Sequence, residues 1–396
     1  MEISKLSKLI TPSGTMAISN KARILREQGK PVIGFGAGEP DFPTPEYVVK
    51  DVQVAAEDTS NHKYSPVAGL TILKEEIVRT SKLYSGINVQ QENILVSNGG
   101  KHAILTTFMS ILNPGDEVLI PSPYWTTYPE AVKISGGNPI IVDTEFDEDF
   151  KVNTDQLDAL KTSKTKILVW VSPSNPTGVV YTKEEAEKIY NWAFENNVWI
   201  LSDELYEHLV YEGMTSPSPA QYDTELNNTI IINGVAKAYS MTGWRVGWII
   251  ANTDVIDMAK KIQSHATSNV SNISQIAAYS ALKNGLNETK IMKESFNRRR
   301  LYAIEEFSNI ENVNLIKSTG AFYLFPDVSY YSSNGVINGV HNSIDFCNWL
   351  LDEYFIAFVP GEVFGKNGFL RCSYALSDDD LHEGLSRFSK AIKEIQ

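Results

Sequence analysis

Lys237 and Arg245 are two cations in the otherwise small and apolar stretch GVAKAYSMTGWRVG, which spans residues 234–247. Lysine is rarely buried unless it is paired or takes part in chemistry. A lysine amine can form a Schiff base with an aldehyde, and a guanidinium binds phosphate as a planar fork. From this stretch alone, the interpretation that both side chains extend to the surface is slightly favoured. Whether Lys237 and Arg245 are surface residues or parts of a site therefore depends on the residues predicted to lie around them.

Glycines, polar residues and aromatic residues follow the short apolar runs in the middle of the chain. In open α/β sheets, ligands bind outside the carboxyl ends of the strands, so these positions are candidates for one site. Each also has a structural explanation, such as a turn glycine, a helix-capping aspartate or a core tryptophan. Their occurrence after successive runs favours a shared site. The candidates are Gly99, Gly100, Lys101, Tyr124, Trp125, Asn175, Asp203, Tyr206 and Lys237.

The chemistry of this set indicates one kind of ligand. A helix that begins after two glycines offers free backbone N–H groups to a phosphate. The pattern is neither G-x-G-x-x-G nor a Walker loop, so a dinucleotide or ATP is not favoured. Trp125 can stack on a flat ring, and a buried Asp203 can keep a pyridine nitrogen protonated. Phosphate, flat ring, pyridinium and the aldehyde for Lys237 together describe pyridoxal phosphate.

An α/β fold must position these residues. Short apolar runs alternate with helical patterns, which is typical of βαβ units and a mostly parallel sheet. Strands are predicted in NILVS, DEVLIPS, KILVWVS, VWILSD, TIIING and RVGWII, and Thr182 and Glu185 form a capping box before a helix. Further along, one long helix and short strands indicate an α+β arrangement. We predict a large domain at residues 40–285 and a small discontinuous domain made of residues 1–39 and 286–396.

The composition excludes several classes of protein. A formal net charge of -13 over 396 residues argues against a nucleic-acid surface. The one basic run, at residues 298–300, is predicted to be a solvated helix face. Two distant cysteines fit a reducing compartment, and six scattered histidines show no metal-binding spacing. No apolar run approaches the ~18 residues that cross a bilayer. We expect a cytoplasmic protein without metal, nucleic-acid or membrane partners.

Eight motifs connect the predicted site to a known family. Each is a weak signal, but their shared order along residues 37–375 is specific. They are AGEPDFPTP, KYSPVAGL, SNGGKHAI, SPYW, SPSNPTG, SDELY, GVAKAYSMTGWRVG and FLRCSYA. In these motifs the chain resembles class I pyridoxal-phosphate-dependent aminotransferases, and within them the I-beta subgroup of aspartate aminotransferases. The resemblance implies fold type I, with a mostly parallel sheet sandwiched by helices and a smaller α+β domain, and a homodimer with shared active sites.

The resemblance implies roles for five residues around the cofactor ring. Lys237 is expected to hold the cofactor as a Schiff base and to move the proton between the substrate α-carbon and the cofactor. Asp203 is expected to pair with the pyridine nitrogen. Tyr206 and Asn175 are expected to hydrogen-bond the phenolic oxygen of the ring, and Trp125 to stack on its face.

The phosphate is expected to contact Arg245 and the helix start at Gly99, Gly100 and Lys101. Many relatives carry hydroxyl residues just before the lysine, where this chain has glycine and alanine. Arg245 and the helix N-terminus must therefore contribute more of the phosphate binding. Tyr64 of the partner subunit is expected to reach the same phosphate.

Substrate contacts are also implied. Arg371 is expected to hold the α-carboxylate as a bidentate fork, which lysine cannot copy. Lys101 is expected to reach the distal carboxylate of a dicarboxylic substrate; the alternative is that only its backbone contacts the phosphate and its side chain is idle in solvent. Cys372 is interpreted as a buried small hydrophobe and not as a nucleophile. The substrate-binding set is Ser13, Thr15, Gly38, Lys101, Trp125, Asn175 and Arg371.

The function implied is ping-pong transfer of an amino group from an L-amino acid, with aspartate favoured, to 2-oxoglutarate. One alternative within the enzymes is an aromatic, prephenate or broad-range aminotransferase, or a carbon–sulfur lyase on the same fold. A second is a cofactor-binding regulator, which would need a fused helix-turn-helix domain, and the residues before Met16 leave no room for one. A purely structural protein would not need Asp203, Lys237 and Arg371 together.

Overall fold

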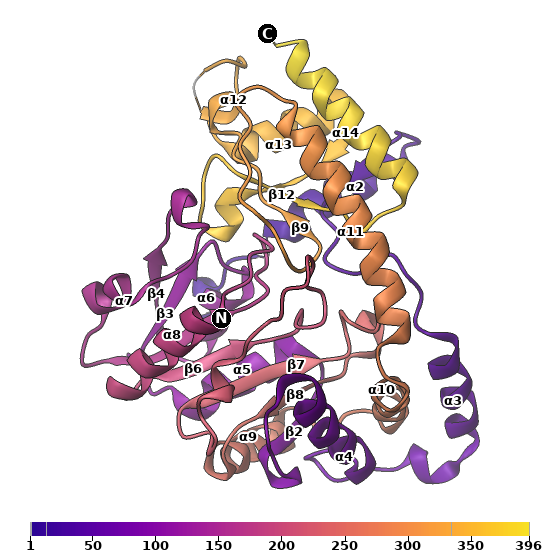
Figure 1. Cartoon of the computed structure of the whole chain (residues 1–396), viewed down its shortest axis with the longest axis vertical. Helices are drawn as coiled ribbons and strands as arrows, with labels where there is room; N and C mark the ends of the chain where they lie inside the picture. The colour runs from indigo at the N-terminus through magenta and orange to yellow at the C-terminus, as the bar shows by residue number, and fades with distance from the viewer. Residues whose placement is uncertain (1, 13, 334, 396) are drawn as a thin grey trace.

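The computed structural model describes residues 2–12, 14–333 and 335–395 (Figure 1). Within these residues, the largest sheet has seven strands in the order β2-β8-β7-β6-β5-β3-β4. β8 is antiparallel to both of its neighbours, and the other neighbouring strands are parallel. The strands are β2 (Ile94–Ser97), β3 (Glu117–Ser122), β4 (Asn138–Asp143), β5 (Thr165–Val171), β6 (Trp199–Asp203), β7 (Thr229–Gly234) and β8 (Gly247–Ile250).

Helices cover both faces of this sheet. Successive strand residues point to opposite faces, and in β5 Ile167 and Val169 join one core while Leu168 and Trp170 join another. The first face packs against α5 (Gly100–Ile111), α6 (Thr127–Ile134) and α9 (Thr253–Ala266). The second packs against α3 (Glu46–Glu57), α4 (Thr71–Thr80), α7 (Thr154–Leu160), α8 (Lys183–Glu195) and α10 (Asn272–Asn284). The predicted sheet sandwiched by helices is confirmed.

Local sequence signals explain where individual elements begin. The side chain of Thr182 accepts a hydrogen bond from the backbone N–H of Glu185, and the Glu185 carboxylate accepts one from the N–H of Thr182. This is the predicted capping box, and it starts α8. Gly99 precedes α5 with a φ of +83°, a conformation that strongly favours glycine.

A second core joins the beginning of the chain to its end. β1 (Ile33–Gly34) pairs in parallel with β10 (Ile356–Ala357). A separate sheet has the order β11-β12-β9, from Val359–Pro360, Leu370–Ser373 and Tyr323–Leu324. The helices that contribute to this core are α2 (Gly14–Glu27), α11 (Asn287–Ser308), α12 (Ser329–Ser333), α13 (Ser343–Tyr354) and α14 (Asp378–Lys393). We propose that the domains divide as the sequence predicts, after residues 39 and 285.

The long helix α11 connects the two cores. In Figure 1 it rises from the level of α10 and runs beside α14. The basic run at residues 298–300 lies in α11, and the prediction that it forms a solvated helix face is wrong for two of its three residues. Arg298 is exposed, but Arg299 is only 8% exposed and Arg300 1%. Arg300 donates hydrogen bonds to the Ser318 carbonyl and to Glu212, and these bonds compensate for its burial.

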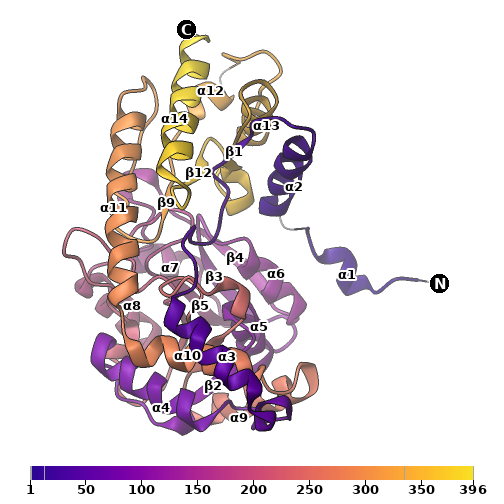
Figure 2. The same cartoon turned by 90° about the vertical axis from the view of Figure 1, so that its right-hand side faces the viewer.

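The first helix, α1 (Lys5–Leu9), lies at the surface, where its neighbour in the fold is α6. Figure 2 shows α1 extending outward from the body of the chain, and none of its residues is buried. Across the described residues, no helix has the length and apolar character needed to cross a bilayer.

Candidate active site

The strand ends and the second core enclose one cavity of about 530 Å³. It lies where β5, β6 and β7 end and where α5 begins. The cavity brings together ten of the sequence-predicted residues, which are Gly38, Gly100, Lys101, Trp125, Asn175, Asp203, Tyr206, Lys237, Arg245 and Arg371. Residues 38 and 371 reach it from the second core, while the others come from the seven-stranded sheet and its loops.

Lys237 lines this cavity from the loop after β7. Its Nζ donates a hydrogen bond to the carbonyl of Gly38 and lies 5.7 Å from the centroid of the Tyr206 ring. Burial, followed by the nearby charge of Arg371, lowers the pKa of Lys237 to about 8, although the carboxylates of Glu39 and Asp203 act in the opposite direction. A lysine with this pKa has a sizeable neutral fraction near neutral pH, and the neutral amine is the nucleophile and proton acceptor.

Asp203 ends β6 and is 3% exposed. Its Oδ2 accepts a hydrogen bond from the Tyr128 hydroxyl at 2.7 Å, and its Oδ1 accepts one from the backbone N–H of Leu205 at 3.3 Å. Burial raises the pKa of the Asp203 carboxyl, while these two hydrogen bonds and the charge of Lys237 oppose the rise. A buried carboxylate in this setting gains most from a cationic partner, such as a protonated ring nitrogen.

Tyr128 was missed in the sequence analysis. It lies in α6, three residues after Trp125, and the two rings meet edge to face with centroids 5.6 Å apart. Trp125 precedes the N-cap of α6 and is not part of the helix, so no helical spacing in the sequence pointed from Trp125 to Tyr128. Tyr128 is fully buried, and its hydroxyl orients the Asp203 carboxylate.

Arg371, in β12, makes two hydrogen bonds through its guanidinium and lines the cavity. Its Nη1 donates to Asn175 Oδ1 and its Nη2 to the Gly36 carbonyl, both at 3.0 Å. The buried Nε has no hydrogen-bond partner among the described residues. Leaving a buried donor unsatisfied costs about 1–3 kcal/mol, and more for a charged group. The guanidinium also lies over the Tyr323 ring, 4.6 Å from its centroid. This arrangement suits a carboxylate ligand.

Arg245 lies against the start of α5. A Cβ added to Gly99 would come within 2.7 Å of Arg245 Nη2, and one added to Gly100 within 2.6 Å of a Leu205 methyl. Glycine therefore allows the guanidinium and the helix N-terminus to come together. Free N–H groups beside a cation form an anion site that suits a phosphate.

Two tyrosines close the side of the cavity near Lys237. The hydroxyl oxygens of Tyr206 and Tyr323 are 2.9 Å apart, and both side chains are buried. Tyr323 was also missed: it lies in β9, in the part of the chain where the sequence indicated only short strands of an α+β arrangement. Lys101 also lines the cavity, with its Nζ 5.2 Å from the Trp125 ring centroid. Burial and the charge of Arg245 lower the pKa of Lys101.

Other predicted residues lie away from the cavity or cannot be placed. The side chain of Tyr64 is not among those lining the cavity, and Tyr64 is 90% exposed in the single chain. Ser13 lies outside the described residues, as does the side chain of Thr15. Cys372 is fully buried, and burial raises the pKa of its thiol, as expected for a packing residue and not for a nucleophile.

The sequence model of a family described as aminotransferase class I and II matches residues 30–388. The chain belongs to this family. An aspartate aminotransferase of Streptomyces avermitilis is 46% identical over 389 residues, covering 98% of this chain and 95% of that protein. A probable aspartate/prephenate aminotransferase of Aquifex aeolicus is 40% identical over 395 residues, covering 99% of this chain and 98% of that protein.

The fold of this aminotransferase also matches solved structures. The crystal structure of the aspartate aminotransferase of Rhizobium meliloti has a TM-score of 0.95 and 34% sequence identity, and the match covers 99% of each chain. The fold type I architecture and the aminotransferase family predicted from the eight motifs are both confirmed.

Proposed function

We propose that this aminotransferase uses pyridoxal phosphate to transfer the amino group of aspartate to 2-oxoglutarate. The observation that carries the proposal is that one cavity is lined by the buried Asp203 and Arg371 together with Lys237, whose pKa is lowered to about 8. The names of the relatives support aspartate as the donor. In the ping-pong order, the amino acid leaves as its 2-oxo acid before a second 2-oxo acid takes up the amino group.

The cavity fits the chemistry of pyridoxal phosphate. Gly99 and Gly100 at the start of α5, together with Arg245, suit the phosphate, and Asp203 suits a protonated pyridine nitrogen. When bound, this cofactor withdraws the electron pair left at the substrate α-carbon. Lys237 would hold the cofactor and take the α-proton on its Nζ. Asp203 would keep the proton on the ring nitrogen.

The remaining residues would fix the orientation of ring and substrate. Asn175 and Tyr206 would bind the phenolic oxygen of the ring, and Trp125 would stack on its face. Arg371 would hold the substrate α-carboxylate, with the backbone of Gly38 beside it. The hydrogen bond from Arg371 to Asn175 supports these roles, because it joins the carboxylate site to the ring site.

Prephenate is the second candidate amino acceptor, because some relatives are named aspartate/prephenate aminotransferases. We also propose a cytoplasmic location, since Cys347 and Cys372 are buried and unpaired, as in a reducing compartment.

Lys101→Ser tests the proposed preference for dicarboxylic substrates. Lys101 would bind the distal carboxylate, assisted by Ser13 and Thr15 of the N-terminal segment. Removing one charge-assisted contact should lower kcat/KM for aspartate and glutamate by about ten- to a hundredfold. Steady-state kinetics with phenylalanine supply the control, because this donor has no distal carboxylate and should be spared. An equal loss for acidic and aromatic donors would mean that Lys101 serves the cofactor and not the substrate.

A homodimer with shared sites is proposed from Tyr64, whose exposed hydroxyl would bind the cofactor phosphate in the partner's site. Tyr64→Phe should raise the Kd of pyridoxal phosphate by about ten- to a hundredfold, because one bond to a charged oxygen is lost. Mixing Tyr64→Phe chains with Lys237→Ala chains should restore one native site in each hybrid dimer. Wild-type cofactor affinity at that site supports the trans arrangement, while an obligate monomer in sedimentation equilibrium rules it out.

A further inference from the structure

The buried Arg299 of α11 joins three parts of the chain that are far apart in sequence. Its Nη1 donates to Asp41 Oδ1 at 2.8 Å, and its Nε donates to Asp378 Oδ1 at 2.6 Å. The guanidinium carbon also lies 5.5 Å from the centroid of the Phe42 ring. Asp378 begins α14, whereas Asp41 belongs to residues 36–44, which we call the linker segment. One cation therefore attaches the linker segment to both long helices.

The linker segment contains neither helix nor strand, so tertiary contacts must hold its backbone in place. Two of its carbonyls reach the proposed site: Gly36 accepts a hydrogen bond from Arg371 Nη2 at 3.0 Å, and Gly38 accepts one from Lys237 Nζ. The carboxylate of Glu39 accepts a hydrogen bond from Thr242 at 2.6 Å. The same few residues thus contact the cation proposed for the α-carboxylate and the amine proposed for the α-proton.

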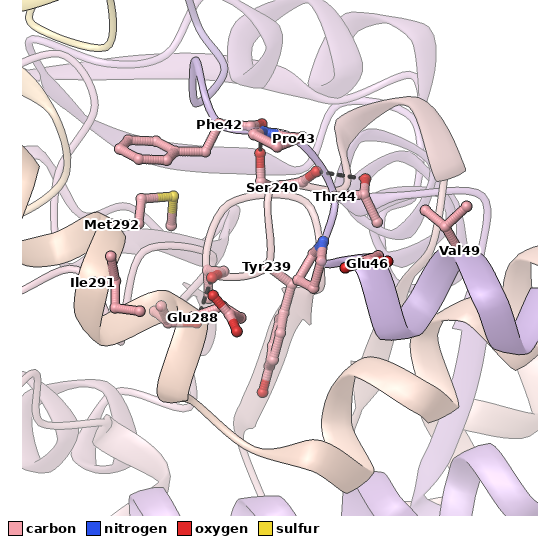
Figure 3. A pocket seen from close by; sticks show the side chains of 13 residues that line it. Phe42, Pro43, Thr44, Glu46, Val49, Tyr239, Ser240, Glu288, Ile291 and Met292 are labelled. Carbon is pink, nitrogen blue, oxygen red and sulfur yellow. Dashed lines mark hydrogen bonds between the residues drawn. The ribbon is translucent and has the colours of Figure 1, made fainter.

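The far end of the linker segment is attached to the loop that carries Lys237. Figure 3 shows two hydrogen bonds between them. The Ser240 hydroxyl donates to the carbonyl of Phe42, and the Thr44 hydroxyl donates to the carbonyl of Ser240 at 3.0 Å. A cavity of about 520 Å³ borders these contacts, between the linker segment and the first turns of α11. The linker segment is thus attached at Phe42 and Thr44 to the loop that carries Lys237. The ion pair of Asp41 with Arg299 attaches it, in addition, to α11.

We infer that Arg299 is a positioning residue, which sets the relative placement of Arg371 and Lys237 through the linker segment. The inference rests on the proposed function, because it concerns the binding of a substrate carboxylate. A displaced Arg371 would make a poorer contact with the substrate carboxylate, and weakening one charge-assisted contact costs about tenfold in affinity. The placement of Arg371 controls carboxylate affinity, so the loss should fall mainly on KM and less on kcat.

Three variants of the holoenzyme test this role. Arg299→Gln removes both ion pairs, and Asp41→Asn removes only the pair with the linker segment while Asp378 still compensates Arg299. Both should raise the KM for aspartate, and the Kd of succinate in calorimetry, about tenfold. Arg298→Gln is the matched control: Arg298 also pairs with Asp378, at 2.8 Å, but among the described residues it has no ion pair with Asp41. It should change both constants less than about twofold.

The outcomes separate this inference from the function on which it rests. A wild-type protein without aminotransferase activity defeats the proposed function itself. An active wild type with unchanged succinate affinity in Asp41→Asn overturns the positioning role, even if Arg299→Gln fails to fold. Equal effects in Arg298→Gln also overturn it, because Asp378 alone would then be responsible. A purely structural role would lower the yield of active protein and leave KM and Kd unchanged.

Discussion

Lys237→Ala should lower kcat by at least about 10⁴-fold, the upper range for loss of a positioned general acid or base. The alanine variant has neither the amine that holds the cofactor nor the base that takes the α-proton. It should still bind pyridoxal phosphate, because Arg245, the start of α5 and Asp203 remain. Steady-state turnover of aspartate gives the rate, and the absorbance of the bound cofactor shows that its site is occupied.

Two further measurements connect that loss to the Lys237 amine. Borohydride reduction followed by peptide mapping should label Lys237 but not Lys101, the other lysine that lines the cavity. In protein stripped of cofactor, an amine-reactive reagent should modify Lys237 with a midpoint near pH 8, since its pKa is lowered to about 8. The neutral amine reacts, so a lowered pKa moves reactivity to lower pH than for an ordinary lysine, whose pKa is about 10.4. Label on another lysine would end the assignment.

The sheet was predictable because its strands are short continuous apolar runs, as parallel strands buried on both faces require. The direction of β8 was not predicted, although the chain carried a signal for it. Twelve residues lie between the end of β7 at Gly234 and the start of β8 at Gly247, and their only helix is a short 3-10 turn. A parallel neighbour needs a crossover, usually through an α-helix. The missing helix therefore favours the antiparallel pairing that is observed.

The site residues that could be predicted from the sequence are those that come at the ends of individual strands. Asn175, Asp203 and Lys237 come directly after apolar runs, so the rule for strand ends finds them. Arg371 and Gly38 come from the second core, and only the resemblance to a family placed them in the same site. The burial of Arg299 depends on Asp41, 258 positions away in sequence, and no local pattern contains that information.

Asp203→Asn should lower kcat for aspartate by about 10²–10³-fold, the scale of one preorganised electrostatic contact to developing charge. Asparagine keeps the size of the side chain and can still accept the hydrogen bond of Tyr128. It carries no negative charge, so it cannot stabilise a proton on the pyridine nitrogen. The substitution therefore separates charge from shape. The affinity for pyridoxal phosphate in fluorescence titration should fall much less than kcat, because the phosphate contacts remain.

Tyr128→Phe tests the same role with a smaller change, because it removes only the hydrogen bond to the Asp203 carboxylate. The Tyr128 hydrogen bond lowers the pKa of Asp203 against the effect of burial, so its loss should raise that pKa further. A more basic Asp203 draws the shared proton away from the ring nitrogen, and kcat should fall about tenfold, the equivalent of one hydrogen bond to a charged group. The pH dependence of the bound cofactor's absorbance should shift in both variants, and more in Asp203→Asn. Near-normal turnover in Asp203→Asn, or a larger loss in Tyr128→Phe, would show that the carboxylate does not hold the ring proton.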